Sequence, residues 1–276
     1  MKRLPDVDSD YERFLSRGWL RFSHDADLAN WVARAIPVAE RLRNDPDLVQ
    51  QWLRCGGTWF AGVNIFPNDA HGAIPDASVP PLSGAVIDFI VDKLGFDGIT
   101  WDPAQISVCY PGYPQPWDGE SDAAFRFRRD RDAAHVDGLR RSDPGRRRSP
   151  AEGHAFILGI PLNTADPNAA PLVVYEGSQE IIRSALRDRL GGIGPDDWRS
   201  EDVTEAYTAA RRDAFERCPR VPVTAKPGEC YLVHRLAVHG VAPWTAPEVA
   251  GAKRSIAYFR PDPDPGGSLA WWLGQP

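Results

Sequence analysis

The chain of 276 residues is long enough for one large domain or two small ones, and its 42% hydrophobic residues allow a substantial buried core. Its net charge of −6 argues against general binding to nucleic acids or to anionic membranes. The sequence predicts no transmembrane helix and no signal peptide, because no apolar run is long enough for either. The four cysteines have no C-x-x-C spacing, as is typical of reduced thiols, so we expect a cytoplasmic protein.

The N-terminal third of the chain is expected to be mainly helical. Apolar residues recur at helical spacing over residues 25–53, where Pro37 and Pro46 should kink or divide the helix because proline lacks a backbone donor. A further helix is predicted over 84–94, and Gly95 can end it in a left-handed conformation.

From residue 105 onward the sequence consists of short runs rich in β-branched and aromatic residues, each bounded by Pro, Asn or Gly. The predicted strands are 105–110, 154–162, 170–177, 229–234 and 255–260. Two helices are expected to interrupt this series, one capped by Ser178 and the other following Thr204.

This order of elements indicates a single domain over residues 1–276. A mainly helical part, residues 1–100, is expected to buttress a mainly β core, residues 101–260, that contains helical insertions. Helices followed by irregularly spaced strands are typical of a β-sandwich or barrel supported by helices.

The segment AAHVDGL places His135 and Asp137 one residue apart, so that on an extended segment both side chains lie on the same face. One later histidine would complete a two-histidine, one-carboxylate metal site, which leaves coordination positions open for O2 and an organic acid. His234 and His239 are both candidates for it. Alone, His-x-Asp is a weak pattern, and an ordinary surface or core histidine would also fit it.

Arg254 opens the last predicted strand, 15 residues after His239. A guanidinium group there could hold a carboxylate with two parallel hydrogen bonds, as a 2-oxoacid co-substrate would require. The alternative for this arginine is a surface salt bridge.

The order H-x-D, APLVVYEGSQE, PGECYLVHRLAVHG and a strand-borne arginine resembles the phytanoyl-CoA dioxygenase family of Fe(II)/2-oxoglutarate oxygenases. The resemblance covers about residues 100–260 and implies a double-stranded β-helix, the jelly-roll or cupin-like fold. It selects His239 over His234, because His-Gly follows Gly-Asp and a strand in the family, and Gly228-Glu229 takes the place of Gly-Asp here. The implied iron ligands are His135, Asp137 and His239, and the implied anchor of 2-oxoglutarate is Arg254.

The resemblance also places Gln105 and Tyr110 near the co-substrate, although either could be an ordinary strand residue. Gln179 departs from the family pattern, which usually has a non-ligand histidine there, so the departure concerns loop packing or substrate contact. Relatives that chlorinate carbon lack the ligand carboxylate. The presence of Asp137 therefore favours hydroxylation or a related oxidation, in which O2 is consumed and succinate and CO2 are formed.

Residues 124–150 contain nine arginines against four aspartates, a local excess of +5 in a chain of −6. This segment is either a rim that binds an anionic substrate or a solvated loop. The candidate substrate contacts are Arg126, Arg128, Arg131 and Trp117. On the first interpretation, the substrate is a small anionic metabolite or natural-product intermediate.

Two rival functions fit part of the pattern. A cupin-like hydrolase or isomerase would use the same three ligands on Zn(II) to activate water, but Arg254 would then have no role. A non-catalytic barrel with a vestigial metal site is the other rival, because a fold does not guarantee an activity.

Overall fold

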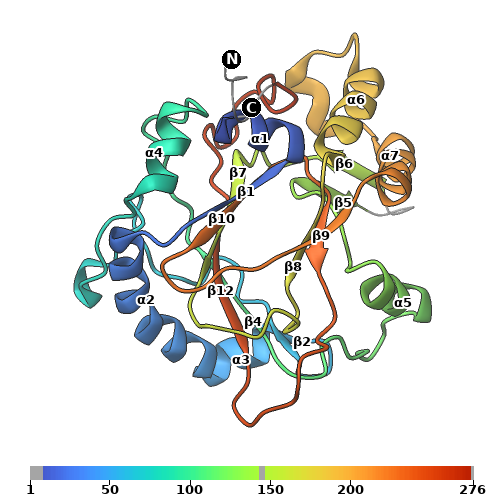
Figure 1. Cartoon of the computed structure of the whole chain (residues 1–276). Coiled ribbons are helices and arrows are strands. Elements are labelled where there is room, and N and C mark those ends of the chain that lie inside the picture. The colour runs from blue at the N-terminus through green and yellow to red at the C-terminus, as the bar shows by residue number, and fades with distance from the viewer. Residues whose placement is uncertain (1–8, 143–146, 275–276) are drawn as a thin grey trace, which may run out of the picture.

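Two antiparallel β-sheets face each other in the computed structural model, which describes residues 9–142 and 147–274 (Figure 1). The larger sheet consists of β1 (Trp19–Phe22), β10 (Cys230–His234), β7 (Phe156–Pro161), β12 (Arg254–Phe259), β4 (Gln105–Cys109), β3 (Trp59–Phe60) and β2 (Leu53–Arg54), in this spatial order. The smaller sheet consists of β11 (His239–Val241), β8 (Leu172–Tyr175) and β9 (Arg220–Val223). A separate hairpin is formed by β5 (Leu139–Ser142) and β6 (Arg147–Pro150).

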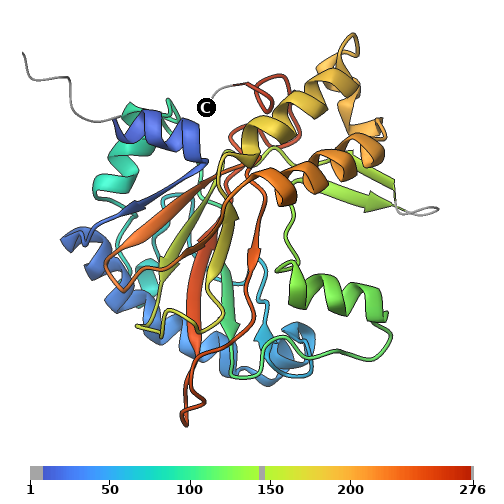
Figure 2. The same cartoon turned by 45° about the vertical axis from the view of Figure 1, so that its right-hand side comes forward.

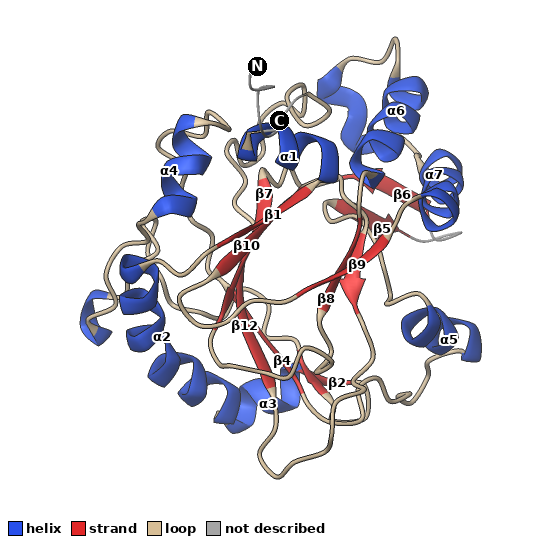
Figure 3. Cartoon of the chain, viewed as in Figure 1, coloured by secondary structure: helices blue, strands red, loops and turns tan. Residues whose placement is uncertain are grey.

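Helices cover the outer faces of both sheets (Figure 3). They are α1 (Asp10–Arg17), α2 (Ala26–Asn44), α3 (Pro46–Trp52), α4 (Ala85–Asp92), α5 (Asp122–Asp130), α6 (Ser178–Leu190) and α7 (Thr204–Arg217), with short 3-10 helices at Pro75–Ala77 and Pro195–Ser200. The first four lie on the side of the larger sheet, and α6 and α7 pack against the smaller one. Figure 2 shows α5 and the β5–β6 hairpin standing to one side of the barrel. Among the described residues, no helix combines the length and hydropathy needed to span a bilayer.

Alternation along each strand creates two apolar layers. In β12, Ala257 and Phe259 face outward into the core shared with α2 and α4, whereas Ile256 and Tyr258 face the space between the sheets. The neighbouring strand β7 alternates in the same way. The strands of the larger sheet are therefore buried on both faces, which explains their nearly continuous hydrophobic sequences.

The predicted strands and helices are confirmed, with small differences at their ends. Pro46 divides the N-terminal helix as expected, because Asp45 caps α3 and Pro46 occupies its first turn. Pro37 instead lies inside a continuous α2. The prediction that Ser178 is an N-cap is wrong: Gly177 takes that position, and the Ser178 hydroxyl accepts a hydrogen bond from the Val238 amide.

Several elements were not expected. The N-terminal third contributes strands β1, β2 and β3 to the larger sheet in addition to its helices. The arginine-rich segment, for which a solvated loop was one interpretation, forms α5 and the β5–β6 hairpin. Its Arg146 lies outside the described residues.

Gly159 of β7 permits a close contact inside the barrel. It lies opposite Tyr231 of β10, and a Cβ at this position would be 2.1 Å from the Tyr231 ring. The ring therefore lies directly over the glycine, and its hydroxyl donates to Tyr258 at 2.9 Å. A side chain at position 159 would displace this pair of tyrosines.

Replacing Gly159 with alanine is expected to lower the free energy of unfolding by about 1–3 kcal/mol, because an added methyl group overpacks the core. Urea unfolding measures the effect. Gly194→Ala is the matched control, since its nearest neighbour would be 3.7 Å away and the residue is exposed. Equal unfolding midpoints for the two variants would contradict the packing described here.

Candidate metal centre and active site

Backbone hydrogen bonds join the two histidine-bearing segments. The amide of His135 donates to the carbonyl of His239 at 2.8 Å, and the amide of His239 donates back at 2.9 Å. This reciprocal pair is an antiparallel bridge, in which directly opposed residues present their side chains on the same face. The two imidazole rings consequently lie with their centroids 5.0 Å apart.

Both imidazole rings are held in the same tautomer. Nδ1 of His135 lies 3.0 Å from the carbonyl oxygen of Ala133, and Nδ1 of His239 lies 3.0 Å from that of Ala237. A carbonyl oxygen can only accept, so Nδ1 carries the proton in each ring. Each Nε2 is then the ring nitrogen that remains to bind a metal, and that of His135 lies at hydrogen-bond distance, 3.0 Å, from Asp137.

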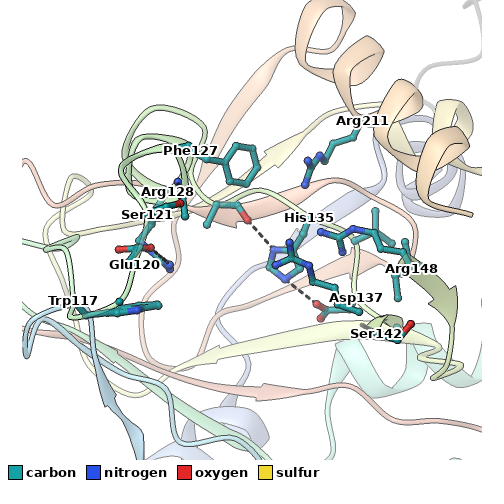
Figure 4. Close-up of a pocket in the computed structure, with 18 residues that line it drawn as sticks. Trp117, Glu120, Ser121, Phe127, Arg128, His135, Asp137, Ser142, Arg148 and Arg211 are labelled. Atoms are coloured by element: carbon teal, nitrogen blue, oxygen red, sulfur yellow. Dashed lines mark hydrogen bonds and ion pairs between the residues drawn. The ribbon is translucent and has the colours of Figure 1, made fainter. Parts of the chain in front are cut away.

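Asp137 completes the set. Its Oδ1 lies 3.0 Å from Nε2 of His135, and its Oδ2 lies 3.8 Å from Nε2 of His239. One ligand atom from each of the three residues lies within 4.8 Å of the other two. Figure 4 shows His135 and Asp137 at the centre of a cavity wall. Two imidazole nitrogens and one carboxylate oxygen form the donor set of a facial metal site with open positions.

The surroundings favour a charged Asp137 and a neutral His239. Burial opposes the charged form of Asp137, but the hydrogen bond from His135 and the positive charge of Arg260 lower the pKa of Asp137 well below its usual value. Burial lowers the pKa of His239 to about 4. Asp137 is therefore a carboxylate, and His239 a neutral imidazole, at neutral pH.

An ion pair between a buried aspartate and an exposed arginine holds the segment that precedes His135. Asp132 and Ala133 both have positive φ angles, 58° and 51°, which are unfavourable for residues with a Cβ. Arg220 of β9 binds both carboxylate oxygens of Asp132, at 2.7 and 2.8 Å. On the other side, a Cβ on Gly240 would be 2.2 Å from the Asp132 carbonyl, so the residue after His239 must be glycine for this approach.

Two cavities meet at His135 and Asp137. The inner cavity, about 260 Å³, lies between the sheets and is also lined by His239, Gln105 and Tyr258. The outer cavity, about 940 Å³, lies between α5, the β5–β6 hairpin and α7 (Figure 4). The candidate metal centre therefore lies between a small cavity inside the barrel and a larger one outside it.

Arg254 lies inside the barrel, next to the inner cavity. Its Nη2 donates to the hydroxyl groups of Tyr258, at 2.8 Å, and Tyr231, at 3.3 Å. Its Nη1 is buried and has no hydrogen-bond partner among the described residues. The residue is only 5% exposed, so this unpartnered donor is a strong site for a carboxylate.

Gln105 also faces the inner cavity. It is hydrogen-bonded to Arg260, a residue that the sequence did not single out. Its Oε1 accepts a hydrogen bond from Arg260 at 2.6 Å, and Arg260 also lies 3.4 Å from Oδ2 of Asp137. The alternation of β12 places Arg260 on the same face as Arg254, and this was the only sequence signal for it.

The structure does not bring Tyr110 to the site. It follows β4 on the face of Ile106 and Val108, and it packs against the core outside the barrel. The alternation of β4 explains this placement, since Gln105 and Ser107 take the inward positions.

Two of the four expected substrate contacts line the outer cavity. Arg128 and Trp117 face it, with the guanidinium 4.4 Å above the indole ring and paired to Glu120 at 2.7 Å. Arg126 and Arg131 are exposed and do not line it. Arg126 lies on another face of α5, and Arg131 is the residue that follows the helix. Arg131 instead stacks on Phe215 of α7.

Replacing Arg220 with glutamine is expected to lower the free energy of unfolding by about 1–3 kcal/mol, because it leaves a buried carboxylate without its partner. It should also weaken metal binding, since Asp132 holds the backbone next to His135. Urea unfolding and a Co(II) titration measure the two effects. Arg217→Gln, which removes an exposed pair with Asp213, is the control and should change neither. A stable Arg220 variant with unchanged Co(II) affinity would rule out this support.

No family model matches the sequence, and no curated protein matches it. Solved structures do match. EctD from S. alaskensis, crystallised with 2-oxoglutarate and 5-hydroxyectoine, aligns with a TM-score of 0.50 at 17% identity over 100% of this chain and 87% of its own. The epimerase SnoN, in complex with Fe3+, alpha ketoglutarate and nogalamycin RO, aligns with a TM-score of 0.46 at 15% identity over 91% of this chain and 81% of its own. For EvdMO1 the TM-score is 0.48 at 17% identity, and the match spans 91% of this chain but 49% of that protein.

The likeness to EctD concerns the fold. Together with the two facing antiparallel sheets, it confirms the expected double-stranded β-helix buttressed by helices. The chain thus shares the fold of EctD, and its His-Asp-His cluster lies inside that fold.

Proposed function

We propose that this protein is a non-haem Fe(II)/2-oxoglutarate-dependent oxygenase that hydroxylates a C–H bond of a small anionic metabolite or natural-product intermediate. One observation carries the proposal: hydrogen bonds at Nδ1 fix His135 and His239 with Nε2 turned toward the carboxylate of Asp137, inside a double-stranded β-helix. Bound Fe(II), with 2-oxoglutarate and O2, would supply the oxidising power for C–H cleavage, and succinate and CO2 would be formed.

The three side chains would hold the iron. Two neutral imidazoles and one carboxylate neutralise only part of the charge of Fe(II), which favours a further anionic ligand at the open positions. The Nδ1 hydrogen bonds keep both rings in the orientation that binding needs, so little order is lost when the metal binds.

The inner cavity would hold 2-oxoglutarate. This cavity is lined by the three ligands at one end, and Tyr258 connects it to Arg254. The unpartnered Nη1 of Arg254 would bind the distal carboxylate. Gln105 and Arg260 offer further polar contacts beside Asp137.

The outer cavity would hold the substrate to be oxidised, because it reaches the same ligands from the other side. Asp137 occupies the position that carbon-chlorinating relatives leave free for halide. Its presence supports hydroxylation over halogenation.

An anaerobic titration with Fe(II) and then 2-oxoglutarate, followed by visible spectroscopy, tests this proposal. We expect the weak charge-transfer band of the chelate in the wild type and its loss in His135→Ala. Arg254→Gln should weaken 2-oxoglutarate binding by about 1.5–3 kcal/mol, roughly ten- to a hundredfold, because a charged hydrogen-bond partner is removed. Arg187→Gln, on the outer surface of α6, is the control and should behave as the wild type.

Absence of the band from folded, iron-loaded wild-type protein would contradict the proposal. Metal analysis of the protein as purified separates it from the hydrolase alternative, which predicts zinc. O2 uptake that depends on 2-oxoglutarate separates it from a non-catalytic barrel.

A further inference from the structure

Three arginines from separate segments line the outer cavity with His135 and Asp137. They are Arg141 of β5, Arg148 of β6 and Arg211 of α7. Figure 4 shows Arg148 and Arg211 on one side of His135, whereas Trp117, Glu120 and Arg128 lie on the other side. We call the three residues the rim arginines.

The rim arginines lack the acidic partners that neighbouring arginines have. Among the residues that the structure describes, no carboxylate lies within ion-pair distance of any of the three. Arg147 precedes Arg148 in β6, points the other way and pairs with Asp202 at 2.9 Å. Arg128, across the cavity, is paired with Glu120. The positive charge of the cavity is therefore concentrated on the hairpin and α7.

The strand pairing makes this concentration unfavourable for the free protein. Arg141 and Arg148 are directly opposite each other in the β5–β6 hairpin. Like charges at directly opposed positions destabilise a strand pair. Burial, together with the charges of Arg141 and Arg211, lowers the pKa of Arg148. An anion bound between the two guanidinium groups would relieve this repulsion.

Two of the rim arginines are also held in position. The guanidinium groups of Arg148 and Arg211 lie 5.1 and 5.3 Å from the ring centroid of Tyr207, and that of Arg211 lies 4.8 Å from that of Phe127. Stacking uses the flat faces of these groups and leaves N–H donors at their edges. The backbone of Arg148 is hydrogen-bonded to Thr204 and Val203, which fixes the hairpin to the start of α7.

We propose that Arg141, Arg148 and Arg211 bind a phosphoryl group of the substrate and so place its C–H bond near the metal centre. This inference rests on the proposed function, since it concerns the same site. A single carboxylate satisfies one guanidinium fork, whereas a phosphoryl group is a dianion with three acceptor oxygens, enough for several arginines at once. The location in the outer cavity separates this subsite from Arg254, which serves the inner one.

Calorimetric titration of the metal-free protein with inorganic pyrophosphate and inorganic phosphate tests the subsite. Wild type is expected to bind both anions, and Arg148→Gln or Arg211→Gln should weaken pyrophosphate binding at least tenfold. Arg148→Lys, which keeps the charge but loses the fork, should lie between. Arg147→Gln is the matched control, because it removes a neighbouring arginine that faces away, and it should bind as wild type.

The thermal midpoint of Arg141→Gln provides a second test, and here the inference predicts a more stable protein, so the result cannot be confused with misfolding of the variant. Because Arg141 is exposed and faces Arg148, its removal should raise the thermal midpoint of the free protein. Saturating pyrophosphate should then stabilise this variant less than it stabilises the wild type. A lower midpoint without anion would contradict the repulsion on which the inference depends.

Failure of pyrophosphate to bind wild-type protein, or equal binding by Arg148→Gln and Arg147→Gln, would overturn the inference. These outcomes are independent of the spectroscopic test of wild-type protein. A chelate band without phosphate binding would reject the subsite alone. Phosphate binding without a band would retain the subsite and reject the proposed oxygenase.

Discussion

The pair of backbone hydrogen bonds between His135 and His239 is the constraint on which the site depends. It joins the segment before the β5–β6 hairpin to β11 of the smaller sheet and places both imidazoles beside each other. The ion pair between Asp132 and Arg220 and the close approach of Gly240 hold this junction from either side. Ligand geometry must be kept within a fraction of an ångström for a metal site, so such backbone support matters as much as the ligands.

The junction also separates the inner cavity from the outer cavity, and different arginine side chains lie beside each of them. Arg254 lies beside the inner cavity, and its Nη1 has no hydrogen-bond partner among the described residues. The rim arginines, Arg141, Arg148 and Arg211, line the broad outer cavity. Opposite sides of one metal centre would thereby recognise two different anions, the co-substrate from within the barrel and the substrate from outside.

Local patterns in the sequence predicted what is local in the structure. Runs rich in β-branched and aromatic residues, each bounded by turn residues, predicted the strands of the core, and one-residue spacing predicted that His135 and Asp137 lie on one face. Arg260 was missed because its contact with Asp137 exists only after strands distant in sequence are aligned. Arg141 and Arg148 could not be selected from the nine arginines of residues 124–150, since facing the cavity depends on the pairing of β5 with β6. Arg211 lies outside that segment, so no pattern in the sequence groups it with them. Ser178 was misjudged because a tertiary contact with Val238 competes with capping.

A crystal structure of the anaerobic protein with Fe(II) and 2-oxoglutarate tests the central claim most directly. The account predicts iron bound by Nε2 of His135, Nε2 of His239 and the carboxylate of Asp137, with the distal carboxylate of 2-oxoglutarate on Nη1 of Arg254. Iron held by any other set of residues, or a distal carboxylate bound to Arg260 while Arg254 keeps only its tyrosine partners, would contradict it.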